Sequence, residues 1–223
     1  TNGERGFLAK HLAVIGEHWV PYYTQAGYRP ESISVWPAFR FNLSQTDQAS
    51  SDLSLLVVLP IDPGFALSVV VKTLRATLAI TEIRVRLRFH PRMGPVAPVL
   101  DKALTIVGQP LPAHVTVSTQ SLSEDLAASS VVIATVTTVE YEAACRGKRL
   151  IALLSEHSLD YNFLPKNEFH AICRDAEALQ KVILAWQHKL PKAEPWSQEK
   201  STASFQPLTA LALDRVWADL GLS

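Results

Sequence analysis

The stretch LSLLVVL, residues 53–59, decides the fold class of this chain. A short, nearly continuous apolar run is typical of a strand that is buried on both faces of a parallel sheet, because a strand with one wet face would alternate apolar and polar residues. The turn Asp62-Pro63-Gly64 follows, and residues 65–79 have the spacing of a helix. The pattern therefore begins with a buried strand that leads into a helix.

The same alternation continues to the end of the chain. Further strands are predicted at residues 82–89, 115–118, 131–134 and 150–154, and helices at 96–107, 123–128, 138–146, 176–188 and 208–220. This order predicts an α/β fold with a mainly parallel, Rossmann-like sheet and helices on both faces. Such sheets bind ligands outside the carboxyl ends of their strands, where the strand order reverses. Site residues are therefore expected in the turns that follow the strands.

Residues before the first strand follow another pattern. Apolar side chains between Gly6 and Gly27 have helical spacing, and the polar stretch from Asn42 to Asp52 is typical of a linker. About 50 residues are too few for a usual domain of 100 or more. We predict two parts: residues 1–42, a helical segment and linker from a missing or truncated N-terminal domain, and residues 43–223, the Rossmann-like domain.

Composition excludes several classes of function. Lys+Arg and Asp+Glu are both 21, so the chain lacks the basic surplus of a general nucleic-acid binder. The two cysteines, Cys145 and Cys173, have no metal-type spacing and indicate free thiols in a reducing cytoplasm. No apolar run reaches the roughly 20 residues of a membrane span. We therefore expect a cytoplasmic protein without a metal site.

The turn after residues 131–134 carries three hydroxyls, those of Thr135, Thr137 and Thr138, at a predicted helix N-terminus. Hydroxyls and free backbone N–H groups at such a place can bind an anion. Thr137 and Glu140 also fit a capping box, which needs no ligand and is the commoner arrangement. Glu142, one turn inside the helix, could bind the hydroxyls of a ribose, although an exposed surface position is the commoner arrangement.

A second candidate group ends the strand at residues 82–89. His90 precedes Pro91 there, and its imidazole can donate to a phosphate or leaving-group oxygen or merely cap the strand end. Arg88 lies near enough to help with phosphate. It belongs to a stripe with Arg84 and Arg86 that is solvated, covered by a missing partner domain, or ion-paired to a neighbouring helix.

Two weaker candidates lie in other turns. Gly64, after the first strand, would let a ligand approach the backbone closely, although Asp-Pro-Gly is also ordinary turn chemistry. Asp160 and Asn162, in the loop after the strand at residues 150–154, could contact a sugar or base. No Walker loop, nucleophile elbow or metal cluster is found in the sequence.

Several motifs in this order resemble the C-terminal domain of bacterial surface-polysaccharide glycosyltransferases of the GT-B fold. The resemblance covers roughly Ile33 to Pro165 and is carried by these motifs: SISVWPAFRFN (32–42), LLVVLP (55–60), VRLRFHP (85–91), SSVVIATVTTVEYEAACRGKRLIAL (129–153) and LDYNFLP (159–165). In that family a strand ends in His-Pro, and a later strand leads into a Ser/Thr cluster followed by Glu-Ala and a glycine.

The resemblance implies a nucleotide sugar as substrate and no separate cofactor. The Ser/Thr cluster and His90 would lie near the phosphates, and Glu142 near the ribose. CMP-activated acidic sugars share these features in the family, and UDP- and GDP-sugars stay open. The acceptor would be a growing polysaccharide or a glycolipid, which leaves peripheral membrane association open. Family members usually take their catalytic base from an N-terminal domain, so we expect this chain to act as part of such an enzyme. If the base is absent here, the chain alone binds donor without transferring it.

Other readings of the same features stay open. A sugar-nucleotide 2-epimerase or a related hydrolase shares the two-domain architecture. A binding subunit without activity of its own would complete its site with a partner. A flavodoxin-like domain of unrelated role is the simplest alternative, since fold alone does not imply function.

Overall fold

The computed structural model describes residues 9–38, 52–135, 137–154, 164, 168–204 and 209–221. The chain divides into two compact units, residues 46–195 and a second unit that combines residues 1–45 with residues 196–223. This division differs from the predicted one, which placed residues 196–223 in the Rossmann-like domain. Side-chain hydrogen bonds explain the grouping, because the indoles of Trp19 and Trp36 donate to Ser204 O and to Asp219 Oδ2, at 3.3 and 2.9 Å.

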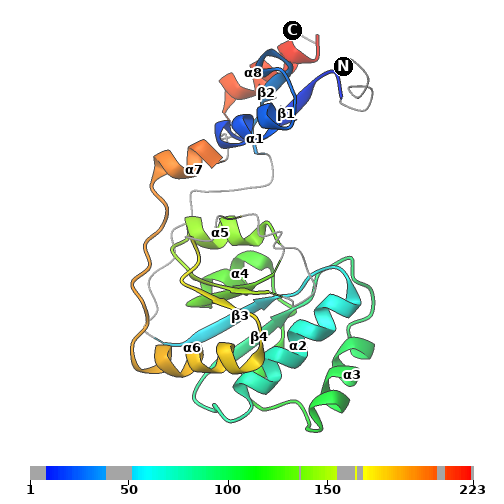
Figure 1. Cartoon of the computed structure of the whole chain (residues 1–223), viewed down its shortest axis with the longest axis vertical. Helices are drawn as coiled ribbons and strands as arrows, with labels where there is room; N and C mark the ends of the chain where they lie inside the picture. The colour runs from blue at the N-terminus through cyan, green and yellow to red at the C-terminus, as the bar shows by residue number, and fades with distance from the viewer. Residues whose placement is uncertain are drawn as a thin grey trace. The chain divides into compact units, whose positions relative to one another are not determined.

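Residues 46–195 form a six-stranded sheet in which all paired strands are parallel, with the order β5-β4-β3-β6-β7-β8 (Figure 1). The strands are β3 Ser54–Val58, β4 Arg84–Arg88, β5 Val115–Val117, β6 Val131–Ala134, β7 Arg149–Leu153 and β8 Ala171–Cys173. Each of the five predicted strands is present. The short strand β8 was not predicted.

Helices cover both faces of this sheet. They are α2 Pro63–Thr77, α3 Ala97–Val107, α4 Leu122–Ala127, α5 Val139–Cys145 and α6 Ala176–His188. Helix α2 packs against α3 and α6, while α4 and α5 lie on the opposite face (Figure 1). Local chemistry begins each of three helices: the Asp62 and Asp175 carboxylates accept backbone N–H groups at α2 and α6, and Ser121 forms a capping box with Glu124 at α4.

The buried core follows the apolar runs of the sequence. Every residue of β3 and β6 is buried, as expected for strands covered on both faces. From β3 the chain proceeds to β4 and β5 on one side and then crosses to β6, β7 and β8 on the other. The strand order therefore reverses between β3 and β6, which is where a sheet of this kind binds its ligand.

The second unit contains a two-stranded parallel sheet, β1 Leu12–Val14 with β2 Ile33–Val35. Short helices η2 Glu17–Trp19, α1 Val20–Gln25 and η3 Pro30–Ser32 connect the strands, and α7 Gln198–Ser204 and α8 Ala210–Asp219 complete the unit. None of the described helices is both long and apolar enough to cross a bilayer.

The helical pattern predicted across Gly6–Gly27 is wrong for much of the described part, where Leu12–Val14 form a strand and two short helices follow. Two features of the sequence explain the difference. Gly16 lies so close to α7 that a Cβ there would approach Ser204 O to 2.3 Å, so packing fixes an extended backbone at this point. Pro21 lies in the first turn of α1, where proline is tolerated, so a separate short helix begins there.

Candidate functional site

His90 and Thr135 reach the same edge of the sheet. They follow β4 and β6, which flank β3 and run parallel to it, so the three carboxyl ends meet at one edge. Two strand spacings separate β4 from β6, which places the two turns roughly 10 Å apart. The sequence-based expectation that these turns share an edge of the sheet therefore agrees with the topology.

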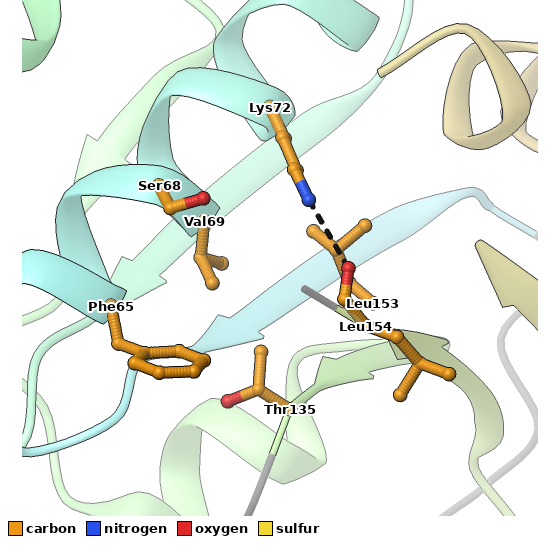
Figure 2. A pocket seen from close by; sticks show the side chains of 7 residues that line it. All are labelled: Phe65, Ser68, Val69, Lys72, Thr135, Leu153 and Leu154. Atoms are coloured by element: carbon orange, nitrogen blue, oxygen red, sulfur yellow. Dashed lines mark hydrogen bonds between the residues drawn. The ribbon is translucent and has the colours of Figure 1, made fainter. Parts of the chain in front are cut away.

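Thr135 is the most unusual polar residue of this edge. Only 3% of its surface is exposed, and its hydroxyl oxygen has no hydrogen-bond partner among the described residues. It lines a small cavity between the carboxyl ends of β6 and β7 and one side of α2 (Figure 2). A buried hydroxyl without a partner costs about 1–3 kcal/mol, so a native protein that retains one calls for an explanation.

The remaining walls of the cavity come from α2 and from the end of β7: Phe65, Ser68, Val69, Lys72, Leu153 and Leu154. Lys72 reaches across from α2, and its Nζ donates to Leu154 O at 3.1 Å and to Arg174 O at 2.6 Å (Figure 2 shows the first bond). Sequence reasoning missed this lysine. A lysine inside a helix of ordinary amphipathic spacing gives no signal that separates it from a surface residue.

His90 is half-buried, and its ring is oriented by the backbone two residues on. The Arg92 N–H donates to His90 Nδ1 at 3.1 Å. Because Nδ1 accepts, the neutral ring carries its proton on Nε2, which leaves an N–H donor for a ligand oxygen. The described lining of the Thr135 cavity does not include His90. The two residues thus share an edge and differ in their immediate surroundings.

The predicted capping box at α5 is wrong. Thr137 Oγ1 does accept the Val139 N–H, at 3.3 Å, and Thr138 occupies the N-cap position without a side-chain cap. Glu140, however, turns away from the N-terminus, because its fully buried carboxylate accepts the Leu164 N–H at 3.3 Å. The hydroxyl of Thr138 is therefore not used as a helix cap, and the roles of both threonines towards phosphate stay predictions.

Glu142 forms an ion pair with Arg146 one turn later on α5, with Oε1 and Nη2 2.9 Å apart. The side chain of Glu142 is 19% exposed, and Arg146 is held further by Ser123, whose carbonyl and hydroxyl oxygens accept from its guanidinium. The exposed-surface alternative is thus replaced by a structural ion pair. A ribose could still compete for this carboxylate, and that role stays a prediction.

Arg88 forms an ion pair with a buried carboxylate. Its Nη1 lies 2.6 Å from Asp125 Oδ2 on α4 and also donates to Gln120 O, while Arg86 Nη1 lies 3.3 Å from Asp125 Oδ1. Of the three explanations for the arginine stripe, ion pairing to a neighbouring helix is confirmed for these two residues. Arg88 therefore fastens α4 to β4, and we leave it out of the site that we propose.

The weaker candidates gain little support. Gly64 is exposed near the start of α2 and has no positive φ, so the backbone there does not require glycine. The nearest N–H groups are partly used, because Phe65 N donates to Asp62 Oδ1 at 2.8 Å. Asp160 and Asn162 lie outside the described residues. Contacts of Gly64, Asp160 and Asn162 with a ligand stay predictions.

Solved structures with the same architecture provide the comparison. HepE of Anabaena, solved with UDP-glucose, is 16% identical with a TM-score of 0.53, over 97% of this chain and 63% of HepE. Sucrose-phosphate synthase of Thermosynechococcus elongatus is 16% identical with a TM-score of 0.58, over 96% and 59% of the two chains. CalG4, the calicheamicin glycosyltransferase, is 15% identical with a TM-score of 0.51, over 96% and 53%.

The chain shares its fold with glycosyltransferases. The predicted fold class, a Rossmann-like sheet of the kind that forms half of a GT-B fold, is thereby confirmed. At these identities the likeness extends to the fold alone. The chain spans about three fifths of the length of HepE and of the synthase. No protein-family model and no curated protein matches the sequence.

Proposed function

We propose that residues 46–195 form the donor-binding half of a glycosyltransferase and bind the phosphate of a nucleotide sugar at the carboxyl edge of the sheet. The observation that carries the proposal is the Thr135 hydroxyl, which is buried and has no partner among the described residues, next to the point where the strand order reverses. HepE, which has the same fold, is solved with UDP-glucose, and this supports the choice of ligand class.

The Thr135 hydroxyl lowers the stability of the free protein as long as it has no partner. An unsatisfied buried donor destabilises the free protein by about 1–3 kcal/mol, and a ligand oxygen that accepts its hydrogen removes this penalty. The protein is thus expected to be more stable with the proposed site occupied than with it empty. Binding sites commonly retain such groups at the expense of stability.

His90 would supply a second donor at the same edge. Its Nε2–H can donate to an oxygen of a phosphate chain that extends from the Thr135 side towards β4. In a transfer reaction the departing phosphate gains negative charge, and donors fixed in advance stabilise that charge. The reaction would then invert the anomeric centre without a metal ion, with an acceptor hydroxyl deprotonated by a base from outside these residues.

The finer identity of donor and acceptor belongs to the same proposal. CMP-activated sugars, with a surface polysaccharide or glycolipid as acceptor, follow from the sequence resemblance, whereas the ligand of HepE is UDP-glucose. A cytoplasmic site of action fits the two free cysteines. These statements differ in one measurable quantity, the preference among CMP, UDP and GDP.

A partner domain or subunit forms part of the proposal. The unit of residues 1–45 and 196–223 leaves large apolar side chains exposed, among them Tyr22, Leu211 and Trp217 at 54%, 64% and 47%. Exposed apolar surface of this kind marks interaction sites. Its two-stranded parallel sheet is mostly only partly buried, although parallel strands are normally covered on both faces.

The test uses two matched substitutions, Thr135→Val and Thr73→Val. Thr73, on α2, is fully buried, and its hydroxyl has no partner among the described residues either. Both variants replace a hydroxyl that has no described partner by a methyl group. Their free energies of unfolding in urea should therefore equal that of the wild type or exceed it by up to about 1 kcal/mol. Only Thr135→Val should weaken binding of CMP, UDP or GDP, roughly tenfold for one lost hydrogen bond to phosphate.

Isothermal titration and urea unfolding provide the two measurements. A wild-type chain that binds none of the three nucleotides, or a Thr135→Val variant with unchanged affinity, would reject the proposed site. The epimerase alternative is separated by product analysis with a labelled nucleotide sugar, since a transferase needs an acceptor. A binding subunit without activity would show nucleotide binding and no turnover even when its partner is present.

A further inference from the structure

Lys72 connects three elements at the carboxyl edge of the sheet. It lies in the third turn of α2, and its ammonium donates to the carbonyl oxygens of Leu154, directly after β7, and Arg174, directly after β8. These two residues end neighbouring parallel strands. One side chain therefore fastens the ends of two strands to the helix that packs over them.

The same lysine forms part of the wall of the Thr135 cavity. Leu153 and Leu154, the residues that it holds in place through the Leu154 carbonyl, line that cavity together with Thr135 (Figure 2). Hydrogen bonds from a charged donor are about twice as strong as neutral ones. Loss of this ammonium would remove one charged donor from the ends of β7 and β8 and would free the end of β7 to move relative to β6.

We propose that Lys72 is a positioning residue of the nucleotide site, which keeps the cavity beside the Thr135 hydroxyl preformed by fixing the ends of β7 and β8. The inference rests on the proposed function and adds a residue that does not itself touch the nucleotide. A preformed site binds more tightly because the ligand need not order the cavity wall. Removal of Lys72 therefore weakens binding indirectly, by allowing the wall to adopt other positions.

Lys148 offers a matched control at the opposite edge of the sheet. It is buried, and its Nζ donates to Ser129 O at 2.9 Å. Lys148 directly precedes β7, and Ser129 lies two residues before β6. Lys148→Met, like Lys72→Met, removes a lysine whose ammonium donates to a backbone carbonyl, and it should lower stability. Because this bond lies at the amino ends of the strands, we expect no change in nucleotide affinity.

The experiment compares Lys72→Met, Lys72→Arg and Lys148→Met in the full chain. Hydrogen exchange is followed at the Leu154 amide, which donates to Cys173 O at 2.8 Å, and at the Leu150 amide at the other end of β7. Titration with CMP, UDP and GDP is run well below the unfolding temperature of every variant. Lys72→Met should speed hydrogen exchange at Leu154 and not at Leu150. It should also lower the affinity for the tightest-binding nucleotide roughly tenfold.

Lys72→Arg, which retains the charged donors, should restore most of the affinity. The inference is overturned if Lys72→Met binds like the wild type, if exchange at Leu154 is unchanged, or if Lys148→Met weakens binding equally. If Lys72→Met and the wild type bind nucleotide equally well, only the positioning role is rejected and the proposed function stands. A wild type that binds no nucleotide rejects the proposed function and the positioning role together.

Discussion

At the scale of single residues, the burial of Cys173 has a consequence for stability at high pH. The thiol ends β8 with 1% of its surface exposed. Burial, with a smaller contribution from the negative charge of Asp175, raises its pKa from 9.0 to about 11. The folded-state pKa is higher than the unfolded one, so the contribution of the thiol to stability is complete below about pH 9 and is lost as the pH rises towards 11.

The corresponding prediction compares the wild type with Cys173→Ala. The substitution leaves a small cavity and lowers stability at pH 8, but it removes the titrating group. The free energy of unfolding in urea should therefore fall more steeply between pH 9 and pH 11 in the wild type than in the variant. Lysines and tyrosines titrate in both proteins and cancel in the comparison. Parallel pH profiles would show that the buried thiol does not resist ionisation.

Single residues also show how far sequence reasoning can reach into the site. Thr135 and His90 were predicted because the end of a strand is visible in the sequence and parallel strands end at one edge. Lys72 was not predicted, because its partners are carbonyl groups 82 and 102 residues away. The pairing of Glu142 with Arg146 could have been predicted from their spacing of four on a helix. Contacts between segments that are far apart in the chain could not be predicted from the sequence alone.

At the scale of elements, the contact between β4 and α4 depends on one carboxylate. Asp125 is fully buried and is contacted by Arg86, Arg88 and the Ser118 hydroxyl, whose oxygen lies 2.5 Å away. Removal of one partner from a buried ion pair leaves the opposite charge uncompensated. The two arginines are partly exposed, with 33% and 20% of their side-chain surfaces accessible, which moderates the cost.

Asp125→Ala is accordingly expected to destabilise residues 46–195 by about 3 kcal/mol, measured by urea unfolding with far-UV circular dichroism. The exposed Asp101 on α3 provides the control, since Asp101→Ala should change stability by less than about 0.5 kcal/mol. If both substitutions have similarly small effects on stability, solvent compensates the charges of Arg86 and Arg88 once the carboxylate is removed. In that case Arg88 would be available to a phosphate, and its exclusion from the site would need revision.

Elements were predicted well where their pattern was long and poorly where it was short. The apolar runs at β3, β6 and β7 identified the central sheet. Strand β8 has three residues and no distinctive period. In the region of β1 and α1, helical spacing of apolar residues arose by chance over a strand and two short helices.

At the scale of the whole molecule, the two units differ in how much core they have. Residues 46–195 contain a continuous cluster of buried aliphatic side chains around the sheet. In the described part of the other unit, the buried apolar residues are Val14, Ala38, Ala212 and Val216. Since stability rises with buried apolar area, the unit of residues 1–45 and 196–223 should unfold first.

Gly16→Ala tests this order of unfolding. An added Cβ would lie 2.3 Å from Ser204 O and 2.7 Å from Ala203 O, both backbone atoms, so α7 must shift, at a cost of about 1–3 kcal/mol. Four of the five tryptophans lie in this unit, at positions 19, 36, 196 and 217, so their fluorescence reports on it. The fluorescence transition in urea should move to lower concentration, while nucleotide affinity stays unchanged.

Gly108→Ala provides the opposite perturbation. Gly108 ends α3 with φ +73° and open space around it, so an alanine there strains only its own backbone, by about 1–2 kcal/mol. This variant should move the circular-dichroism transition of residues 46–195 and leave the earlier tryptophan transition in place. If each substitution instead moves both signals together, the two units unfold as one, and the predicted order of unfolding is wrong.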